Sequence, residues 1–529
     1  MEQDRPRRRT QQQLSVHARE GDARECRNDK QKSPWLVNNL PTMPKASQSQ
    51  PAGLAAASTS VHAEDTRTEA VAGHLSPAER LAHGHAARQT VPRTHHAEWA
   101  PAPRRRDPVT LLEEQNRGRV AWLVPVRHGR MKVSPFAFYR GAARIMAADL
   151  AATPSSGLLV QACGDAHLAN FGVYASPERQ LAFDVNDFDE TLPGPWEWDI
   201  KRLAASCMIA GLHRRFDQAT CESVTARAVE GYRTGITEAA GMGTLDVWYD
   251  HLTADQLREV AEWSQRTMRR QVNRLAQHAR SSDNLQALRR LAVQEAGHSR
   301  IRSDPPLLLP LREIPEFGDT AEVEATVRTA FTSYKQSIGD DRRVVLDRFR
   351  PVDVALKVVG VGSVGTRCFI LLLEGRDRGD PLFLQVKEAA ASVLEEHLAP
   401  SRYKNHGQRV VEGQRLTQAV SDILLGWTRD PAGPDYYVRQ LRDWKGSVDL
   451  EHLAPNEAAG YAFLCGWTLA RGHARSGDAV AIAAYIGRSD VLVRAITAFA
   501  AAYAHQNDED YAAFVAAIEQ GRLEATTGR

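Results

Sequence analysis

Hydrophobic and polar positions follow two different periods along this chain, and the change of period divides it into regions. Over residues 96–310, large apolar residues recur mainly every three or four positions, which predicts helices. Near Arg350 the pattern changes to short, almost continuous apolar runs separated by glycine and turn residues, which predicts strands. The helical period returns over residues 446–529. The pattern therefore predicts an α+β fold, in which a β-rich lobe at 311–445 stands between a mainly helical lobe and the C-terminal helices that complete it.

The first part of the chain, residues 1–95, differs from the rest. It is rich in Gln, Ser, Ala, His and Arg and has few large apolar residues. Such a segment buries too little apolar surface to offset the conformational entropy lost on ordering. We therefore expect residues 1–95 to form a disordered tail. A basic run at 5–9 is more typical of a solvated charged segment than of a nucleic-acid contact.

Composition and charge exclude several classes of protein. The 529 residues carry a formal net charge of +2, so bulk electrostatics gives no reason to expect a nucleic-acid partner. The six cysteines lie far apart without a CxxC pair, which indicates neither a zinc ribbon nor a disulfide scaffold and is typical of a reducing cytoplasm. No apolar run approaches the ~18 residues of a membrane span. We expect a cytoplasmic protein without a membrane partner.

Two predicted strands, "GLLVQAC" and "RQLAFDV", are each followed by a polar motif, "GDAHLANFG" and "NDFDE". In the first motif Asp165 precedes Asn170 by five residues, which is the spacing of the catalytic base and the metal-binding amide in a kinase catalytic loop. In the second motif Asp187 takes the place of the principal metal ligand, and Asp189 is a candidate to assist it. A carboxylate with an amide carbonyl suits Mg²⁺, which prefers hard oxygen ligands. The motifs therefore predict a magnesium site beside a base.

Two neighbouring residues have a smaller expected role. His167 could orient the backbone of the first loop, whereas magnesium rarely selects an imidazole ligand. Asp184 would lie on the opposite face of its strand from Asp187 if the strand runs straight, so we do not include it in the site.

A glycine motif in the β-rich segment suggests a phosphate-binding loop. Gly360, Gly362 and Gly365 form G-x-G-x-x-G. A dinucleotide site requires a helix after these glycines, but "TRCFILLLE" follows and predicts a strand. A glycine loop between two strands covers the ATP phosphates in kinases, because a residue without Cβ lets the backbone approach them closely.

The next predicted strand, "FLQVKEA", contains a lysine among apolar residues. Lys387 would bind the α- and β-phosphates of ATP, and Glu412 in the following predicted helix would be its carboxylate partner. Glu395 and Glu396 are the alternatives to Glu412. A plain hairpin with a glycine turn and a lysine whose amine reaches solvent remains the structural alternative.

Several motifs resemble those of known families. "GDAHLAN" and "NDFDE" resemble the catalytic and metal motifs of aminoglycoside-phosphotransferase-like kinases. Together with "LVPVRHGRMKVSPFAFYRGAA" and "YYVRQLRDWKGS", they resemble, in order, the bacterial family called domain of unknown function 2252, from about Trp99 onward. The resemblance implies a protein-kinase-like fold of two lobes. It also implies that Asp199 holds the catalytic loop through backbone hydrogen bonds, a role compatible with that of a carboxylate at a helix N-terminus. Cys163 stands where the small-molecule kinases usually have His.

The order of the motifs differs from that of ordinary kinases, in which the glycine loop and its lysine come first. Here the catalytic loop is at 164–172 and the glycine loop at 360–365. If both assignments hold, the kinase-like fold is circularly permuted, and the helix near Tyr461 would replace the helix that normally precedes the catalytic loop. Permutation is physically permissible because chain termini often lie close together at a domain surface.

The expected function is that of an ATP- and Mg²⁺-dependent phosphotransferase, with an unidentified small-molecule or protein acceptor that carries a hydroxyl group. Two alternatives stay open: a catalytically silent kinase-like scaffold that binds nucleotide or a partner, and an enzyme that transfers AMP. A metal-dependent phosphoesterase is less favoured. Its chemistry requires two bridged metals, and the sequence has neither an upstream D-x-H motif nor G-N-H-[DE].

Overall fold

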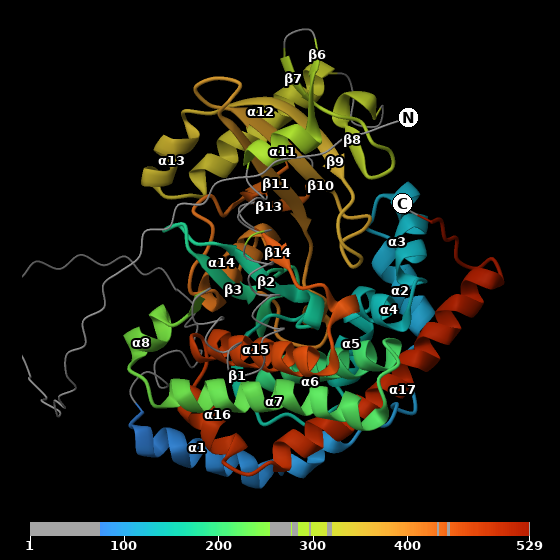
Figure 1. Ribbon diagram of the computed structural model, residues 1–529, viewed down its shortest axis with the longest axis vertical. Coiled ribbons are helices and arrows are strands. Elements are labelled where there is room, and N and C mark those ends of the chain that lie inside the picture. Colours follow the sequence, from blue (N-terminus) through green and yellow to red (C-terminus); the bar gives the residue numbers. More distant parts are fainter. Residues whose placement is uncertain are drawn as a thin grey trace, which may run out of the picture. The chain divides into compact units, whose positions relative to one another are not determined.

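The computed structural model describes residues 75–253, 277, 284–295, 298–314, 320–430, 433–441 and 445–527. These residues form a mixed α+β structure in which the sheets are antiparallel (Figure 1). Residues 1–74 of the expected tail and residues 254–276 of the expected helical region lie outside the described residues.

The first described helix, α1 (Pro77–Thr90), lies inside the segment expected to be a disordered tail, so the boundary expected near residue 95 is wrong. Ser76 begins the helix with a capping box that includes Glu79. Gly84 is buried because α16 (Ala479–Ile486) packs on it so closely that a Cβ there would lie 2.1 Å from a backbone oxygen of α16. Composition did not reveal this helix, because small residues allow close packing without large apolar side chains.

Short helices precede the first strand. They are η2 (Arg93–Ala97), α2 (Pro108–Asn116), η3 (Ala121–Leu123), α3 (Val124–Met131), α4 (Pro135–Gly141) and α5 (Ala143–Leu150). Asp107 caps α2 through the backbone N–H of Thr110, with proline at the first helical position. Within the helical region expected over residues 96–310, the chain breaks at Ala142, where α4 ends and α5 begins.

The two polar motifs lie in loops between short strands. β1 (Leu159–Ala162) pairs with β4 (Leu192–Pro195). β2 (Phe171–Ala175) and β3 (Leu181–Val185) pair with each other, and β14 (Gly446–Ser447) and β5 (Leu252–Thr253) extend their sheet on either side. The first motif, with η4 (Leu168–Asn170), therefore connects β1 to β2, and the second connects β3 to β4.

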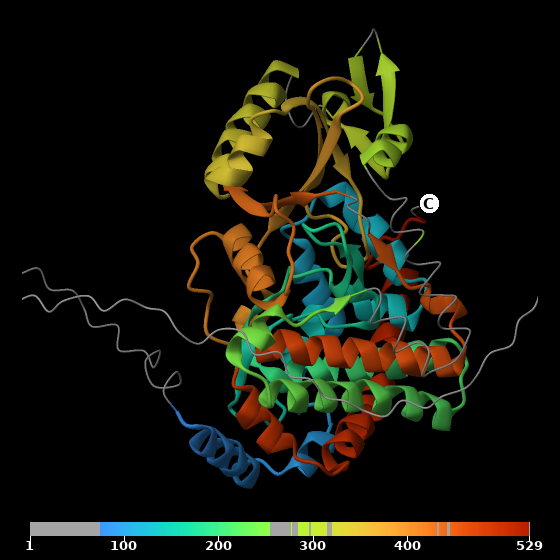
Figure 2. The same cartoon turned by 60° about the vertical axis from the view of Figure 1, so that its left-hand side comes forward.

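Helices from two distant parts of the sequence pack against one another (Figure 1). They are α6 (Trp196–His213), α7 (Gln218–Ala240), α15 (Pro455–Ala474), α16 and α17 (Val491–Glu519), with the short α8 (Thr244–Tyr249) after α7. α7 and α15 lie side by side in both cartoon views (Figures 1 and 2). Glycine permits this approach, because a Cβ at Gly466 would lie 1.9 Å from the carbonyl oxygen of Ala228.

A six-stranded antiparallel sheet forms the β-rich part, in the order β12-β13-β11-β10-β9-β8. Its strands are β8 (Leu308–Pro310), β9 (Arg350–Lys357), β10 (Cys368–Glu374), β11 (Pro381–Ala389), β12 (Gly426–Arg429) and β13 (Asp435–Gln440). α11 (Asn284–Leu291), α12 (Thr320–Gln336) and α14 (His406–Thr417) pack against it, and α13 (Asp340–Leu346) leads into β9. The strand, glycine loop, strand, turn and strand expected from the sequence are all present.

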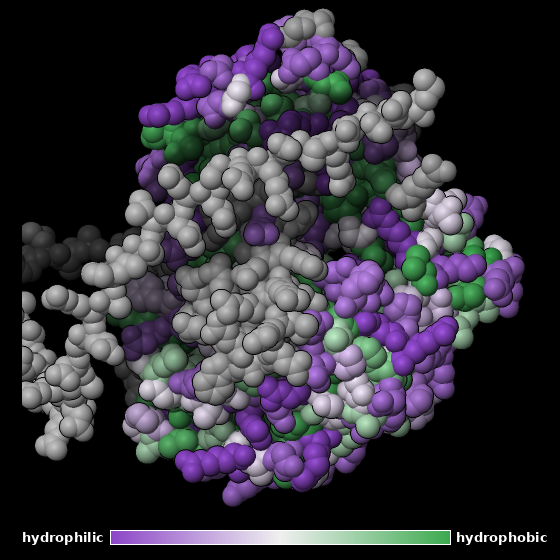
Figure 3. All heavy atoms as spheres, in the orientation of Figure 1, coloured by the Kyte–Doolittle hydropathy of each residue, from purple (hydrophilic) through white to green (hydrophobic). Residues whose placement is uncertain are grey.

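The helical pattern expected over residues 96–310 ends earlier than residue 310. β6 (Ala292–Glu295) and β7 (His298–Ile301) form a separate hairpin there. The remaining short elements are η5 (Leu311–Glu313), η7 (Val393–Glu396) and η8 (Leu450–His452). In the described parts of the chain, no helix is both long and apolar enough to cross a membrane. On the face drawn in Figure 3, hydrophilic residues predominate over the helical part, and hydrophobic residues are more frequent around the β-rich part.

Candidate nucleotide and metal site

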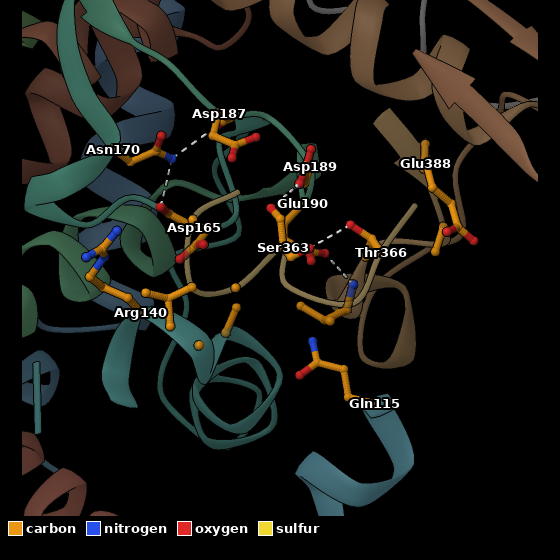
Figure 4. A pocket seen from close by; sticks show the side chains of 18 of the residues that line it. Gln115, Arg140, Asp165, Asn170, Asp187, Asp189, Glu190, Ser363, Thr366 and Glu388 are labelled. Carbon is orange, nitrogen blue, oxygen red and sulfur yellow. Dashed lines mark hydrogen bonds between the residues drawn. The ribbon is translucent and has the colours of Figure 1, made fainter. Parts of the chain in front are cut away.

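Loops from three parts of the chain line a cavity of about 260 Å³. They are the loop between β1 and β2, the loop after β3, and the glycine loop between β9 and β10 (Figure 4). Of the residues expected from the sequence, the lining contains Asp165, His167, Asn170, Asp187, Asp189, Gly360 and Gly362. The fold thus brings together, in one cavity, motifs that are far apart along the chain.

The loop after β1 is held from behind by Asp199, which lies in the first turn of α6. Its two carboxylate oxygens accept hydrogen bonds from the backbone N–H groups of Cys163 (2.6 Å) and Gly164 (2.9 Å). Nε2 of His473, on α15, lies 3.0 Å from Oδ2 of the same carboxylate. The hydroxyl of Tyr461, also on α15, donates to two backbone carbonyls of this loop region. The backbone contacts expected of Asp199 are therefore present, and α15 supports the same loop.

Asp165 is held by an arginine that the sequence did not single out. Nε of Arg202, on α6, donates to Oδ1 of Asp165 at 2.6 Å. Oδ2 lies 3.8 Å from Nε2 of His167, and 24% of the Asp165 side chain is exposed. Burial raises the pKa of Asp165 to about 7, because Arg202 offsets only part of this effect and nearby carboxylates add to it. Arg202 thus holds Oδ1 of Asp165 in place, whereas Oδ2 is available to contact a ligand.

His167 supports the loop through its backbone. Its N–H donates to the carbonyl of Asp165 at 3.0 Å, and its carbonyl accepts from the N–H of Asn170 at 2.8 Å. Burial, together with Arg140 and Arg202, lowers the pKa of His167 well below its usual range. The imidazole is therefore neutral at physiological pH.

Asn170 and Asp187 present the hard oxygens expected for a magnesium ion. The amide nitrogen of Asn170 donates to the backbone carbonyls of Asp165 (3.1 Å) and Asp187 (3.0 Å). This leaves its amide oxygen without a hydrogen-bond donor among the described residues. Although burial opposes the change, Lys387 and Arg439 lower the pKa of Asp187 to about 2, so this carboxylate is charged.

The oxygens of Asn170 and Asp187 suit a magnesium ion that a bound ligand also coordinates. They are too few to hold a metal ion by protein side chains alone. Over the described residues, no group of three or more His, Cys, Asp or Glu side chains is arranged to hold a metal ion. Magnesium is usually bound by one or two carboxylates together with substrate phosphates and water. Asn170 and Asp187 would hold such an ion only together with a phosphorylated ligand.

Lys387 joins the sheet to the metal motif. It lies on β11, only 2% exposed, and its Nζ is 3.1 Å from Oδ2 of Asp187 and also contacts Asp189. The hydroxyl of Tyr437, the residue opposite Lys387 on β13, donates to Asp189 at 2.8 Å. Burial opposes charge here, but the two carboxylates raise the pKa of Lys387 well above its usual range. Lys387 and Asp187, 200 positions apart, meet directly.

Glu412 is not the partner of Lys387. Its carboxylate forms an ion pair with Arg415 on the same helix at 3.1 Å. The two alternative residues are also engaged elsewhere: Glu395 completes the capping box of η7, and Glu396 pairs with an arginine of α5. The carboxylate partners of the lysine come from the loop after β3 and not from a helix.

The glycine loop is held in place by one residue between α2 and α3 and by one residue on α3. Gly360 (φ +63°) and Gly365 (φ +90°) adopt backbone conformations that residues with a side chain rarely take. The backbone N–H of Val120 donates to the carbonyl of Gly365 at 2.7 Å, and Arg130 donates to that of Gly360 at 2.6 Å. The hydroxyl of Ser363 lies 3.3 Å from the carboxylate of Asp189, so the loop reaches the metal motif directly.

Three buried or half-buried arginines were not assigned from the sequence. Arg409, on α14, donates to the carbonyls of Asp189 and Thr191, and Arg202 binds Asp165. Arg140 lines the cavity and forms no ion pair with a described residue. A charged residue within an otherwise apolar helical stretch, as in "KRLAASCM", is the signal that points to Arg202.

Comparison with known proteins identifies the family of this chain. No curated protein and no solved structure matches the chain. The match that exists covers residues 119–517, which include both polar motifs, the glycine loop and Lys387. The chain belongs to the family described as uncharacterized proteins conserved in bacteria, DUF2252.

Proposed function

We propose that this protein is an ATP- and Mg²⁺-dependent phosphotransferase with a circularly permuted, protein-kinase-like fold, which acts on a hydroxyl group of an acceptor. The observation that carries the proposal is the contact between Lys387 and Asp187. It lies beside the cavity that also receives Asp165, Asn170 and the glycine loop. A glycine loop between strands, a buried lysine, and an Asp and Asn pair are the parts that bind the phosphates and the metal in kinases.

The proposed reaction assigns a role to each of these side chains. The acceptor oxygen forms a bond to the γ-phosphorus of ATP, the bond from that phosphorus to the β,γ-bridging oxygen breaks, and ADP leaves with the electron pair. The acceptor proton passes to Oδ2 of Asp165, while Arg202 holds Oδ1. Lys387 would bind the α- and β-phosphates. Magnesium, held by Asn170 and Asp187, would neutralise the phosphate charge.

The packing of α15 supports the permuted order of segments. In ordinary kinases the helix beside the catalytic loop precedes that loop in the chain. Here α15 follows the β-rich part, yet Tyr461 and His473 on it contact the loop after β1 and its support Asp199. A helix that contacts the catalytic loop from later in the chain is what a permuted kinase-like fold would require, and this contact supports the proposal. The cleft between an antiparallel sheet and a helical part is also where the kinase-like arrangement requires the nucleotide.

The test is calorimetric titration of ATP, with and without magnesium, into the wild type and three variants. We expect binding that requires magnesium and becomes at least about tenfold weaker in Asp187→Asn and in Lys387→Met, since each loses a charge-assisted contact. Glu412→Gln is the matched control, because that carboxylate does not line the cavity and, among the described residues, pairs only with Arg415. Its affinity should stay within about twofold of the wild type.

The products then separate the remaining alternatives. ADP with a phosphorylated acceptor supports phosphoryl transfer, whereas pyrophosphate with an AMP-modified acceptor indicates AMP transfer. Nucleotide binding without turnover of any acceptor would indicate a scaffold. If folded wild-type protein does not bind ATP with magnesium at all, the nucleotide proposal is refuted.

A further inference from the structure

A second cavity, of about 700 Å³, adjoins the first. The two cavities share Arg140, Ala169 and Val361 in their linings. Ala169 belongs to the loop that carries Asp165, and Val361 belongs to the glycine loop. The second cavity therefore opens where the proposed base and the phosphate-binding loop meet, which is where an acceptor must lie. Its volume is in the range of small-molecule sites.

The walls of this second cavity are mainly apolar. Phe136 from α4, Phe171 from β2 and Tyr461 from α15 are all buried side chains of the lining. Its carboxylates, Asp449 and Glu451, are exposed. They lie 2.7 Å from His452 and 4.0 Å from His213, respectively. The apolar walls thus suit the carbon skeleton of a ligand. The two carboxylates of the lining are exposed, and each lies beside a histidine.

Arg140 is a positively charged residue that lines both cavities. It lies in the last turn of α4, and its Nε is buried without a hydrogen-bond partner among the described residues. Figure 4 shows it next to Asp165. In contrast, Arg144 one turn further along forms ion pairs with Glu114 (3.1 Å) and Glu396 (2.8 Å).

Arg130, on α3, also lines the second cavity and forms no ion pair with a described residue; it donates to the carbonyl of Gly360. Asp165 acts electrostatically on Arg140, but the two side chains form no ion pair. A desolvated guanidinium without a directly paired carboxylate is unfavourable, and a bound anionic group would compensate it. The planar guanidinium matches carboxylate and phosphate groups with two parallel hydrogen bonds.

We propose that the second cavity is the acceptor site, and that the acceptor is a hydroxylated small molecule whose carboxylate or phosphate group binds Arg140. The anionic group then lies beside the reacting hydroxyl, and the apolar wall contacts the carbon skeleton. This inference rests on the proposed function, because it requires phosphoryl transfer in the adjoining cavity. A concave site of about 700 Å³ matches the size of small-molecule sites, which favours a small molecule over a protein acceptor.

Three probes of similar size test the proposal by calorimetry on protein saturated with magnesium and a non-hydrolysable ATP analogue. They are D-gluconate, D-glucose 6-phosphate and neutral D-glucose, so the two possible anionic groups are tested separately. We expect at least one anion to bind at least about tenfold more tightly than glucose, the effect of one charge-assisted bidentate contact. Arg140→Met should remove this preference, and Arg140→Lys should restore part of it.

Two controls accompany Arg140→Met. Arg117→Met removes the same charge from an exposed position next to Gly118 in the lining of the first cavity, and it should keep the preference for anions. The thermal midpoint of Arg140→Met should not fall below that of the wild type, since the change removes an unpaired charge. A loss of stability would show that Arg140 has a structural role.

The outcomes separate this inference from the proposed function. If both anions bind no more tightly than glucose, the acceptor inference is overturned. If Arg140→Met instead weakens the ATP analogue tenfold, Arg140 belongs to the nucleotide site and the inference is again overturned. If the wild type binds no nucleotide, the proposed function fails, and the same three probes on nucleotide-free protein show whether an anion site exists without it.

Discussion

The substitution Asp199→Asn tests how the loop that carries Asp165 is held. The carboxylate of Asp199 accepts two backbone N–H groups, from Cys163 and Gly164, and contacts His473, and it is 1% exposed. An asparagine keeps one oxygen acceptor but turns an NH₂ group toward a donor. One buried N–H then loses its partner, at about 1–3 kcal/mol, and the remaining contacts lose their charge, at about 1 kcal/mol more. The expected loss of stability is about 2–4 kcal/mol.

This free energy can be converted to observable quantities. With an unfolding entropy of about 2 cal/mol/K per residue and roughly 400 folded residues, 2–4 kcal/mol corresponds to a fall of about 2–5 °C in the thermal midpoint. If the loss is local, amide hydrogen exchange at Cys163 and Gly164 should accelerate at least tenfold, since about 1.4 kcal/mol is a factor of ten. Differential scanning calorimetry and exchange mass spectrometry measure the two effects.

Asp217→Asn is the matched control for this substitution. Asp217 caps α7 by accepting from the backbone N–H of Thr220 at 2.7 Å. Asparagine caps a helix about as well as aspartate, so this control should change the midpoint by less than about 1 °C. If Asp199→Asn has the same thermal midpoint as Asp217→Asn, and hydrogen exchange at the loop is unchanged, the carboxylate of Asp199 does not hold the loop and the reasoning is refuted.

Three further predictions concern the packing and the pH dependence of stability. Arg471→Met breaks the buried ion pair with Asp184 and should lower stability by about 3–5 kcal/mol, seen as a lower midpoint in urea unfolding; an unchanged midpoint would contradict this. Gly466→Ala should destabilise by at least about 2 kcal/mol, because its Cβ meets a backbone oxygen of α7, whereas Gly472→Ala, whose nearest atom would be 3.5 Å away, should not destabilise. Burial lowers the pKa of His96 from 6.5 to about 3. Below pH 6.5 the unfolded chain therefore binds a proton that the folded chain does not, and His96 should cost up to about 2 kcal/mol between pH 6.5 and 5. Thermal midpoints of His96→Gln should fall less steeply over this range, and equal slopes would refute the assignment.

The features that were predictable from the sequence are local. Apolar runs bounded by glycine and turn residues indicated β9, β10 and β11, with the glycine loop between the first two. These features were predictable because the length of a strand and the type of a turn depend on consecutive residues. The spacing of Asp165 and Asn170 indicated one loop for the same reason. The sequence alone did not indicate that both side chains would face one cavity. Only the resemblance to kinases suggested it.

The features that were missed depend on contacts between distant segments. The helical period places Arg409 and Glu412 on neighbouring faces of α14, and only packing against the loop after β3 decides that Arg409 is the one buried. The break at Ala142 and the β6–β7 hairpin are likewise decided by packing, which overrides a periodic pattern. Helix α1 was hidden because its buried positions, Gly84 and Ala87, are small residues.

The contact between Lys387 and Asp187 has a consequence for synthesis. These residues are 200 positions apart, and at about 5–20 residues per second a ribosome needs roughly 10–40 s to proceed from one to the other. During this interval the nascent chain already contains the loops that carry Asp165 and Asp187, but it lacks the lysine that pairs with Asp187 and the helix α15 that contacts the Asp165 loop. The cavity can therefore form only in the last stage of folding, after nearly the whole chain has been made.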